Sequence, residues 1–336
     1  MRDYILARKK RVILLAVLVL TALLSPLVYF KAREAITWRG CLAAPRLESS
    51  GLESPGLESP EIATAHPGRT RFAALGDSGT GDGQQARVAR AVAGQCRPGE
   101  DGAPGCDFLL LLGDNFYPRG VQGVDDPLFG RMYEDMYGSL GIPVLTILGN
   151  HDIRGDAAAQ VLYSGHSATW RMPDFRYEFK AGPARFFARN SNCDHLDMGG
   201  LAHRLDELEG DRSDGSPWRF VLAHHSPYST GGHGDLSWAL GAYWEARLAG
   251  RADFHLSGHN HILEHLQREG DGTDYIVSGA GGIDEEFQGK TRASKARSRF
   301  VHRSLGFVLF DVEPSSVKAR FFDQDGNSLY EFQRKK

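Results

Sequence analysis

The stretch "DFLLLLGDNFY" (107–117) decides the fold, because it joins an unbroken apolar run to a polar turn. A nearly continuous apolar run is typical of a strand that is buried on both faces of a sheet. The glycine and aspartate that follow favour a turn. Tyr117 lies beyond that turn, where a role in the hydrophobic core is not obvious.

The same order of apolar run and polar turn recurs along the chain from residue 70. The other runs are residues 71–77, 143–150, 219–225, 252–259 and 274–282. Segments with helical periodicity lie between them, at 84–94, 125–139, 198–209 and 237–249. Two further strand pairs, 175–179 with 184–189 and 305–312 with 317–323, are expected to be antiparallel. The sequence therefore predicts an α/β fold with mixed sheets.

Polar residues that can bind metals end these runs. They are Asp77, Asp114, Asn150, His224, His259 and His261. Ligands of open α/β sheets bind at the carboxyl ends of the strands, so these side chains are expected to converge. Each motif is weak alone. "GDSG" (76–79), for example, matches the nucleophile motif of trypsin-like serine proteases, but the histidine and aspartate that should precede it are missing.

Taken together and in order, the motifs D-x-G, G-D-x-x-Y, G-N-H-D, V-x-x-H and G-H-x-H resemble the signatures of the calcineurin-like metallophosphoesterase superfamily. Tyr117 makes the chain most similar to the purple acid phosphatases of the tartrate-resistant type. The resemblance implies a four-layer α/β/β/α sandwich over residues 70–336, with two mixed β-sheets and a metal site at the strand ends. The first metal would be held by Asp77, Asp114, Tyr117 and His261. The second would be held by Asp114, Asn150, His224 and His259.

The resemblance also implies an activity. It predicts an Fe(III) ion with a divalent Fe, Zn or Mn ion, and hydrolysis of phosphate monoesters by water activated at the metals. A phosphodiesterase or nucleotidase on the same scaffold is the alternative, because loops rather than ligands choose the substrate. A binding module without activity is a third reading, which the complete ligand set disfavours.

Three residues outside the metal ligands have roles in the related family. His151 is expected to contact phosphate oxygens, with Asp152 orienting its ring, and His233 is a candidate general acid. His225, His255 and His265 match no role and are interpreted as structural or surface residues. The chain departs from the family pattern at Ser78, at Pro118-Arg119 and in "ARNSN" (188–192).

The N-terminal region predicts a membrane anchor. "RKKR" (8–11) precedes an uncharged run at 12–30, which is long enough for a transmembrane helix. The excess of basic residues on the N-terminal flank predicts a cytoplasmic N-terminus (1–11) and a periplasmic or extracellular catalytic domain. Residues 31–69, with the repeat "LESSGLESPGLESP" (47–60), are expected to be a flexible tether.

The cysteines predict one disulfide, and the net charge limits the class of molecule that the protein is expected to bind. Four cysteines occur, and Cys96 and Cys106 bracket a short Gly/Pro-rich loop, so they are the favoured disulfide pair. The formal net charge of −3 gives no global basic field, so we expect a phosphate ester rather than a nucleic acid as partner. The basic run at 290–299 is interpreted as a solvated loop.

Overall fold

The computed structural model describes residues 61–98, 102, 105–192, 215–236, 241, 251–283 and 291–336. The predicted anchor, most of the tether, Cys41, Cys193, the predicted helix at 198–209 and all of the predicted helix at 237–249 except Gly241 lie outside these ranges. Among the helices within them, none combines the length and apolarity that a membrane crossing requires.

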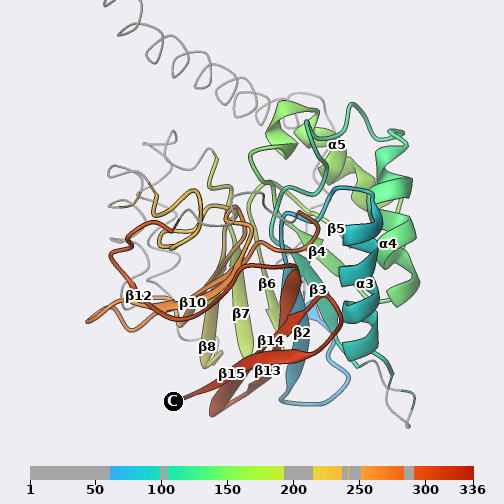
Figure 1. Cartoon of the computed structure of the whole chain (residues 1–336). Helices are drawn as coiled ribbons and strands as arrows, with labels where there is room; N and C mark the ends of the chain where they lie inside the picture. The colour runs from blue at the N-terminus through green and yellow to red at the C-terminus, as the bar shows by residue number, and fades with distance from the viewer. Residues whose placement is uncertain are drawn as a thin grey trace, which may run out of the picture.

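Two β-sheets form the body of the protein (Figure 1). The eight-stranded sheet has the order β1 (Glu61–Ile62), β6 (Tyr177–Ala181), β7 (Ala184–Ala188), β8 (Trp218–Leu222), β9 (Phe254–Ser257), β11 (Asp274–Ser278), β10 (Leu263–Gln267) and β12 (Arg297–His302). The seven-stranded sheet has the order β15 (Ser328–Lys335), β14 (Ser316–Asp323), β13 (Gly306–Glu313), β2 (Thr70–Leu75), β3 (Phe108–Leu111), β4 (Val144–Thr146) and β5 (Trp170–Arg171). Both sheets combine parallel and antiparallel pairs, as predicted.

The β3 strand explains how the layers stack. Successive side chains of a strand point to opposite faces. Phe108 and Leu110 accordingly join the aromatic core between the two sheets, whereas Leu109 and Leu111 pack under the helices. In the core between the sheets the ring of Phe72 stacks on Phe108 at 4.9 Å and meets Phe186 of the opposite sheet edge-on at 5.3 Å. The apolar run of β3 is therefore unbroken because both of its faces are buried.

Helices cover the outer face of the seven-stranded sheet (Figure 1). Helix α3 (Gly83–Gln95) confirms the prediction at 84–94. The helix predicted at 125–139 is a composite of a π-turn η1 (Gly130–Glu134), α4 (Asp135–Tyr137) and a 3₁₀ turn η2 (Gly138–Leu140). The short α5 (Ala157–Leu162) was not predicted.

The end of the predicted tether is part of the folded domain. Strand β1 pairs in parallel with β6, the backbone N–H of Ala65 donates to Asp107, and Arg69 forms an ion pair with Asp311 at 2.6 Å. Packed structure is therefore present from Glu61, earlier than the boundary expected at residue 70.

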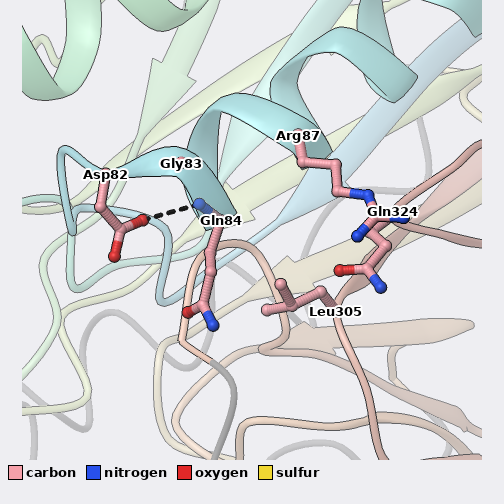
Figure 2. Close-up of a pocket in the computed structure, with 6 residues that line it drawn as sticks. All are labelled: Asp82, Gly83, Gln84, Arg87, Leu305 and Gln324. Atoms are coloured by element: carbon pink, nitrogen blue, oxygen red, sulfur yellow. Dashed lines mark hydrogen bonds between the residues drawn. The ribbon is translucent and has the colours of Figure 1, made fainter.

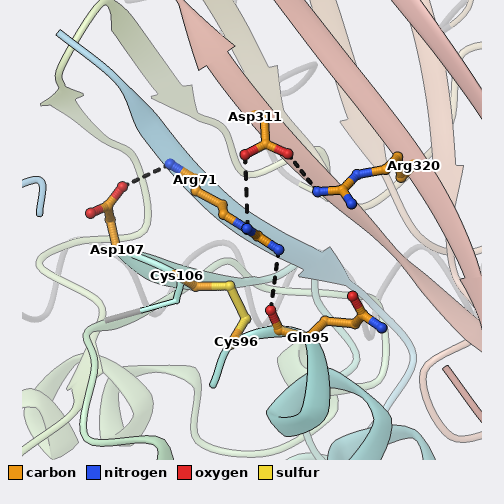
Figure 3. The surroundings of a disulfide bond; sticks show 7 residues. All are labelled: Arg71, Gln95, Cys96, Cys106, Asp107, Asp311 and Arg320. Carbon is orange, nitrogen blue, oxygen red and sulfur yellow. Dashed lines mark hydrogen bonds and ion pairs between the residues drawn. A yellow bond between two sulfur atoms is a disulfide. The ribbon is translucent and has the colours of Figure 1, made fainter. Parts of the chain in front are cut away.

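The predicted disulfide is confirmed, whereas the interpretation of the basic run as a loop is wrong in part. The disulfide Cys96–Cys106 is present and ties the C-terminal end of α3 to the start of β3 (Figure 3). The loop interpretation of 290–299 is wrong from Arg297 onward, because those residues form the edge strand β12, which pairs with β10. Alternate residues of β12 are exposed, so its arginines were compatible with a strand as well as a loop.

Candidate metal centre

The predicted ligands of the first metal surround the hydroxyl group of Tyr117. Its oxygen lies 3.1 Å from Asp77 Oδ1, 2.9 Å from Asp114 Oδ2 and 3.5 Å from His261 Nε2. His261 Nε2 is in turn 3.4 Å from Asp77 Oδ1. These residues follow β2 and β3 of the seven-stranded sheet and β9 of the eight-stranded sheet, so both sheets contribute to the group. The tyrosine that had no obvious role in the core therefore points at two carboxylates.

The predicted ligands of the second metal gather around His224, directly after β8. Its Nε2 lies 3.2 Å from Asn150 Oδ1 and 3.5 Å from Asp114 Oδ2, and its ring centre is 5.2 Å from that of His259. Its Nδ1 faces the carbonyl oxygen of Leu112 at 2.9 Å, so Nδ1 carries the proton and Nε2 is left to bind. Asp114 Oδ2 belongs to both groups.

Three of these residues have unusual backbone conformations. Asp77, Asp114 and His259 have φ angles of 56°, 54° and 68°. Residues other than glycine rarely adopt such angles, and those that do concentrate at functional sites. The sharp turns at the strand ends therefore place the ligands at a cost in local backbone energy.

Two motif glycines are required by close approach. A Cβ atom at Gly149 would lie 2.1 Å from Asp114 Oδ1, and one at Gly258 would lie 2.4 Å from Asp77 Oδ2. No side chain fits at these distances. The glycines of G-N-H-D and G-H-x-H therefore allow the backbone to pass directly behind the carboxylates.

The donor set fits a cation. Ligand atoms of Asp77, Asp114 and His224 all lie within 4.8 Å of one another, and all three side chains are buried. Burial alone would lower the pKa of His224. The negative charges of Asp114 and Asp77 outweigh burial and raise that pKa to about 10. Burial and the same two carboxylates raise the pKa of Tyr117 far above its ordinary value. Both shifts report a strongly negative site, in which a phenolate forms only beside a compensating positive charge.

His151 and Asp152 do not form the expected pair. His151 Nδ1 lies 2.8 Å from the carbonyl oxygen of Pro118, which fixes the proton on Nδ1. The buried Asp152 carboxylate instead accepts from the backbone N–H groups of Asn115, Phe116 and Gly149, and it forms no hydrogen bond with the His151 ring. Burial and the charge of Asp114 raise the pKa of Asp152 to about 7. Asp152 therefore shapes the turns that carry the predicted ligands, and its expected role in orienting His151 stays a prediction.

Two further histidines border the centre. The ring of His233 stacks on that of His259, with centres 4.3 Å apart, and its side chain reaches the surface. His225, for which we expected no role at the site, has its ring centre 4.5 Å from that of His259 and its Nδ1 2.8 Å from Ser191 Oγ. His255 and His265 are buried in β9 and β10 and are structural, as interpreted.

Sequence reasoning also missed Asn260, the variable residue of G-H-N-H. It is fully buried, and its Oδ1 accepts from the backbone N–H of His233 at 3.0 Å. A polar residue between two predicted ligands was the available signal. The pocket drawn in Figure 2, at the start of α3, has a volume of about 580 Å³ and contains none of the predicted ligands.

The fold and the site together define a metal-dependent phosphoesterase. Residues 70–263, more than half of the chain, match the calcineurin-like phosphoesterase family, and the chain belongs to that family.

Among curated proteins, the chain is 27% identical to purple acid phosphatase 4 of Arabidopsis thaliana, over 87% of this chain and 90% of that protein. It is also 27% identical to tartrate-resistant acid phosphatase type 5 of Oryctolagus cuniculus, over 77% of this chain and 89% of that protein. Both relatives are covered over nearly their whole length.

Two solved structures have similar folds. GAP50, described as the anchor in the inner membrane complex of Plasmodium, aligns with a TM-score of 0.66 at 22% identity, covering 80% of this chain and 89% of that chain. Purple acid phosphatase PPD1 from yellow lupin aligns with a TM-score of 0.62 at 18% identity, covering 81% of this chain and 54% of that chain. At these identities the likeness concerns the fold alone.

Proposed function

We propose that the protein hydrolyses phosphate monoesters at a centre of two metal ions, Fe(III) and a divalent Fe, Zn or Mn ion. The observation that carries this proposal is the assembly of two ligand groups that share Asp114 Oδ2, one around the Tyr117 hydroxyl and one around His224. The distant similarity to purple acid phosphatases supports the same activity.

The metals and the histidines have separate roles. When bound, the two ions would supply Lewis-acid activation of the phosphate ester and of the attacking water. His151 is half-buried beside Tyr117, with ring centres 4.4 Å apart, and its Nε2 is the nitrogen available to the phosphate group. His233 is the most exposed histidine of the cluster, which suits a group that protonates the departing alcohol oxygen.

The decisive experiment combines metal analysis with a single substitution in the detergent-solubilised full chain. Asp114→Asn removes the shared carboxylate charge, and we expect loss of hydrolysis of 4-nitrophenyl phosphate together with loss of bound metal. Asp325→Asn, on an exposed turn, is the matched control and keeps both. Unchanged activity in Asp114→Asn, or a wild-type metal content below about one ion per subunit, would refute the proposal.

The substrate class needs its own comparison. We expect 4-nitrophenyl phosphate to be hydrolysed faster than its bis(4-nitrophenyl) diester. The reverse order would assign the site to phosphodiesters. Hydrolysis of neither ester, by protein that contains both metals, would favour a binding role such as the anchor function described for GAP50.

We also propose that the domain is anchored outside the cytoplasm. The uncharged run at 12–30 with its basic N-terminal flank motivates this placement. The disulfide Cys96–Cys106 supports it, because disulfides persist in oxidising compartments. A fusion of alkaline phosphatase after residue 336 should be active, whereas a cytoplasmic reporter at the same position should not.

A further inference from the structure

The loop of residues 227–236, here called the His233 loop, is attached to the eight-stranded sheet by a buried carboxylate. Glu264 lies in β10 and is completely buried. It accepts hydrogen bonds from Ser229 Oγ at 3.0 Å, from the Thr230 backbone N–H at 2.9 Å and from Thr230 Oγ1 at 2.6 Å. Hydrogen bonds to a carboxylate are about twice as strong as neutral ones. The base of the loop is therefore fixed.

Asn260 fixes the tip of the same loop. Its Oδ1 accepts from the backbone N–H of His233 at 3.0 Å, and its Nδ2 donates to the carbonyl oxygen of Gly234 at 3.4 Å. A Cβ atom at Gly231 would lie 2.6 Å from Asn260 Oδ1, so the loop backbone packs directly on the amide. The loop is thus held from the sheet side at two separate points.

Arg292 and Lys295 of the basic run also form hydrogen bonds with the His233 loop. The backbone N–H of Arg292 donates to the carbonyl oxygen of Thr230 at 3.1 Å, and its Nε donates to that of Gly232 at 2.6 Å. Asp235 Oδ2 accepts from the backbone N–H of Lys295 at 2.9 Å. Arg292 contacts the middle of the loop, but it is exposed and therefore the more replaceable support.

His233 depends on this support. Its side chain reaches the surface, and its ring contacts include His259 at 4.3 Å and His261 at 6.2 Å. Such contacts do not fix the backbone from which the ring extends. Catalytic groups lose activity when they move by about 1 Å, so the geometry of the loop decides whether His233 reaches a leaving group.

We infer that Glu264 is a positioning residue, which holds the His233 loop so that His233 can protonate the leaving group. The inference rests on the proposed function, because it assigns a reaction step to His233. The proton passes from the imidazolium form of His233 to the ester oxygen as that oxygen's bond to phosphorus breaks and the attacking water forms the new phosphorus–oxygen bond, so the alcohol departs neutral and His233 is left as imidazole. The hydrogen bonds of the Glu264 carboxylate go to Ser229 and Thr230 of the loop, which is why its role is positioning.

The consequence is a dependence on the leaving group. Protonation by a general acid contributes about 10²–10⁴-fold, and it matters most for an alkoxide, which is a poor leaving group. A nitrophenolate leaves without that help. Misplacing His233 should therefore slow alkyl phosphates selectively.

The test uses two variants of the full chain. Glu264→Gln keeps the side-chain volume and removes the charge; Thr230→Val removes the shortest hydrogen bond and leaves Glu264 in place, in case the first variant folds poorly. For both we expect kcat to fall by at least about tenfold with an alkyl phosphate and by less than about threefold with 4-nitrophenyl phosphate, at unchanged KM. His233→Asn should show the same selectivity.

Asp253→Asn is the matched control. Asp253 is also a buried carboxylate next to a strand of this sheet; it accepts from the Arg219 backbone N–H at 2.9 Å and pairs with Lys336. We expect no selectivity between the two esters. Equal losses on both esters in Glu264→Gln and Thr230→Val would overturn the inference.

A second readout does not depend on activity. Amide hydrogen exchange at Thr230 and His233 should accelerate in Glu264→Gln at least about tenfold, because the Thr230 N–H loses a charged acceptor. Unchanged exchange would overturn the inference. If wild-type protein hydrolyses no phosphate ester, the proposed function fails, and the exchange measurement still decides whether Glu264 holds the loop.

Discussion

The Tyr117 hydroxyl lies between two carboxylates, so it should report sensitively on an ion bound beside them. Free tyrosine ionises near pH 10, and the surroundings of Tyr117 oppose ionisation further. A phenolate there needs a strong Lewis acid such as Fe(III), and the pair would absorb visible light.

Tyr117→Phe should therefore bleach the visible absorption band of the metal-loaded protein and leave the fold intact. Tyr133→Phe is the control, since Tyr133 is a fully buried tyrosine whose hydroxyl group pairs with Thr169 at 2.7 Å and not with a predicted ligand. The measurement is an absorption spectrum with metal analysis. A band that persists at normal metal content in Tyr117→Phe would show that this tyrosine is not a ligand.

Gly149→Ala tests the close approach behind Asp114. The added Cβ would lie 2.1 Å from Asp114 Oδ1, so we expect loss of metal binding and at least about a hundredfold loss of activity. Gly94→Ala is the matched change: Gly94 lies in α3, no heavy atom lies within 4 Å of the point that its new methyl group would occupy, and about 0.5–1 kcal/mol of stabilisation is expected. The metal content and thermal unfolding of both variants show whether only Gly149→Ala loses metal and whether Gly94→Ala is stabilised.

The residues that gather at the candidate metal centre could be predicted from sequence because most of them follow the end of a recognisable strand. The partner of His151 could not. His151 and Asp152 are neighbours at the start of a 3₁₀ turn, η3 (Asp152–Arg154), but their side chains have different hydrogen-bond partners. The buried Asp152 carboxylate accepts hydrogen bonds from three backbone N–H groups, and no sequence motif predicts these bonds.

At the scale of elements, the disulfide stabilises the connection between helix α3 and strand β3. Cys96 ends α3 and Cys106 precedes β3, and ten positions separate them in sequence. Closing a loop of that length in the unfolded chain contributes about 3 kcal/mol.

Replacing both cysteines by alanine should therefore lower the free energy of unfolding by about 3 kcal/mol, measured by urea denaturation. Phosphatase activity below the unfolding transition should not change, because the bond lies at the start of β3 and the ligands follow its end. A loss of activity at full folding would show that the two ends of β3 are coupled.

Strands differ in how well sequence predicts them. β2 and β3 are buried on both faces and read as unbroken apolar runs. β10, β12 and β15 were missed: β10 contains the buried Glu264 and His265, and the two others expose alternate residues. The burial of these polar residues is explained only by their tertiary partners, such as Thr230 for Glu264 and Asp274 for His265.

At the scale of the whole molecule, Asp311 connects the N-terminal segment to the seven-stranded sheet. It lies 2.6 Å from both Arg69 and Arg320, and 3.8 Å from Arg71 (Figure 3 draws Arg71 and Arg320). Burial raises the pKa of Asp311, but the three arginines outweigh burial and hold that pKa below its ordinary value.

A carboxyl whose pKa is lowered on folding stabilises the protein above its unfolded pKa of about 3.9 and loses that contribution as the pH falls through the folded value. Asp311→Asn should therefore destabilise the protein by about 1–2 kcal/mol at neutral pH, and the difference from wild type should vanish in acid. Thermal unfolding across this pH range measures it. Asp325→Asn, which breaks an exposed ion pair with Arg87, should show no more than about 1 kcal/mol and a weaker pH dependence.

The two glycines behind the carboxylates also determine how this site can decay over evolutionary time. Aspartate can become asparagine at position 77 or 114 without any change of shape, so activity can disappear in one step while the fold survives. At Gly149 and Gly258 every other residue collides with a carboxylate oxygen, as it would with an amide. In related proteins that have lost catalytic activity, these glycines should therefore be retained after the predicted ligands have changed. Their presence without the ligands would identify inactive members of the family.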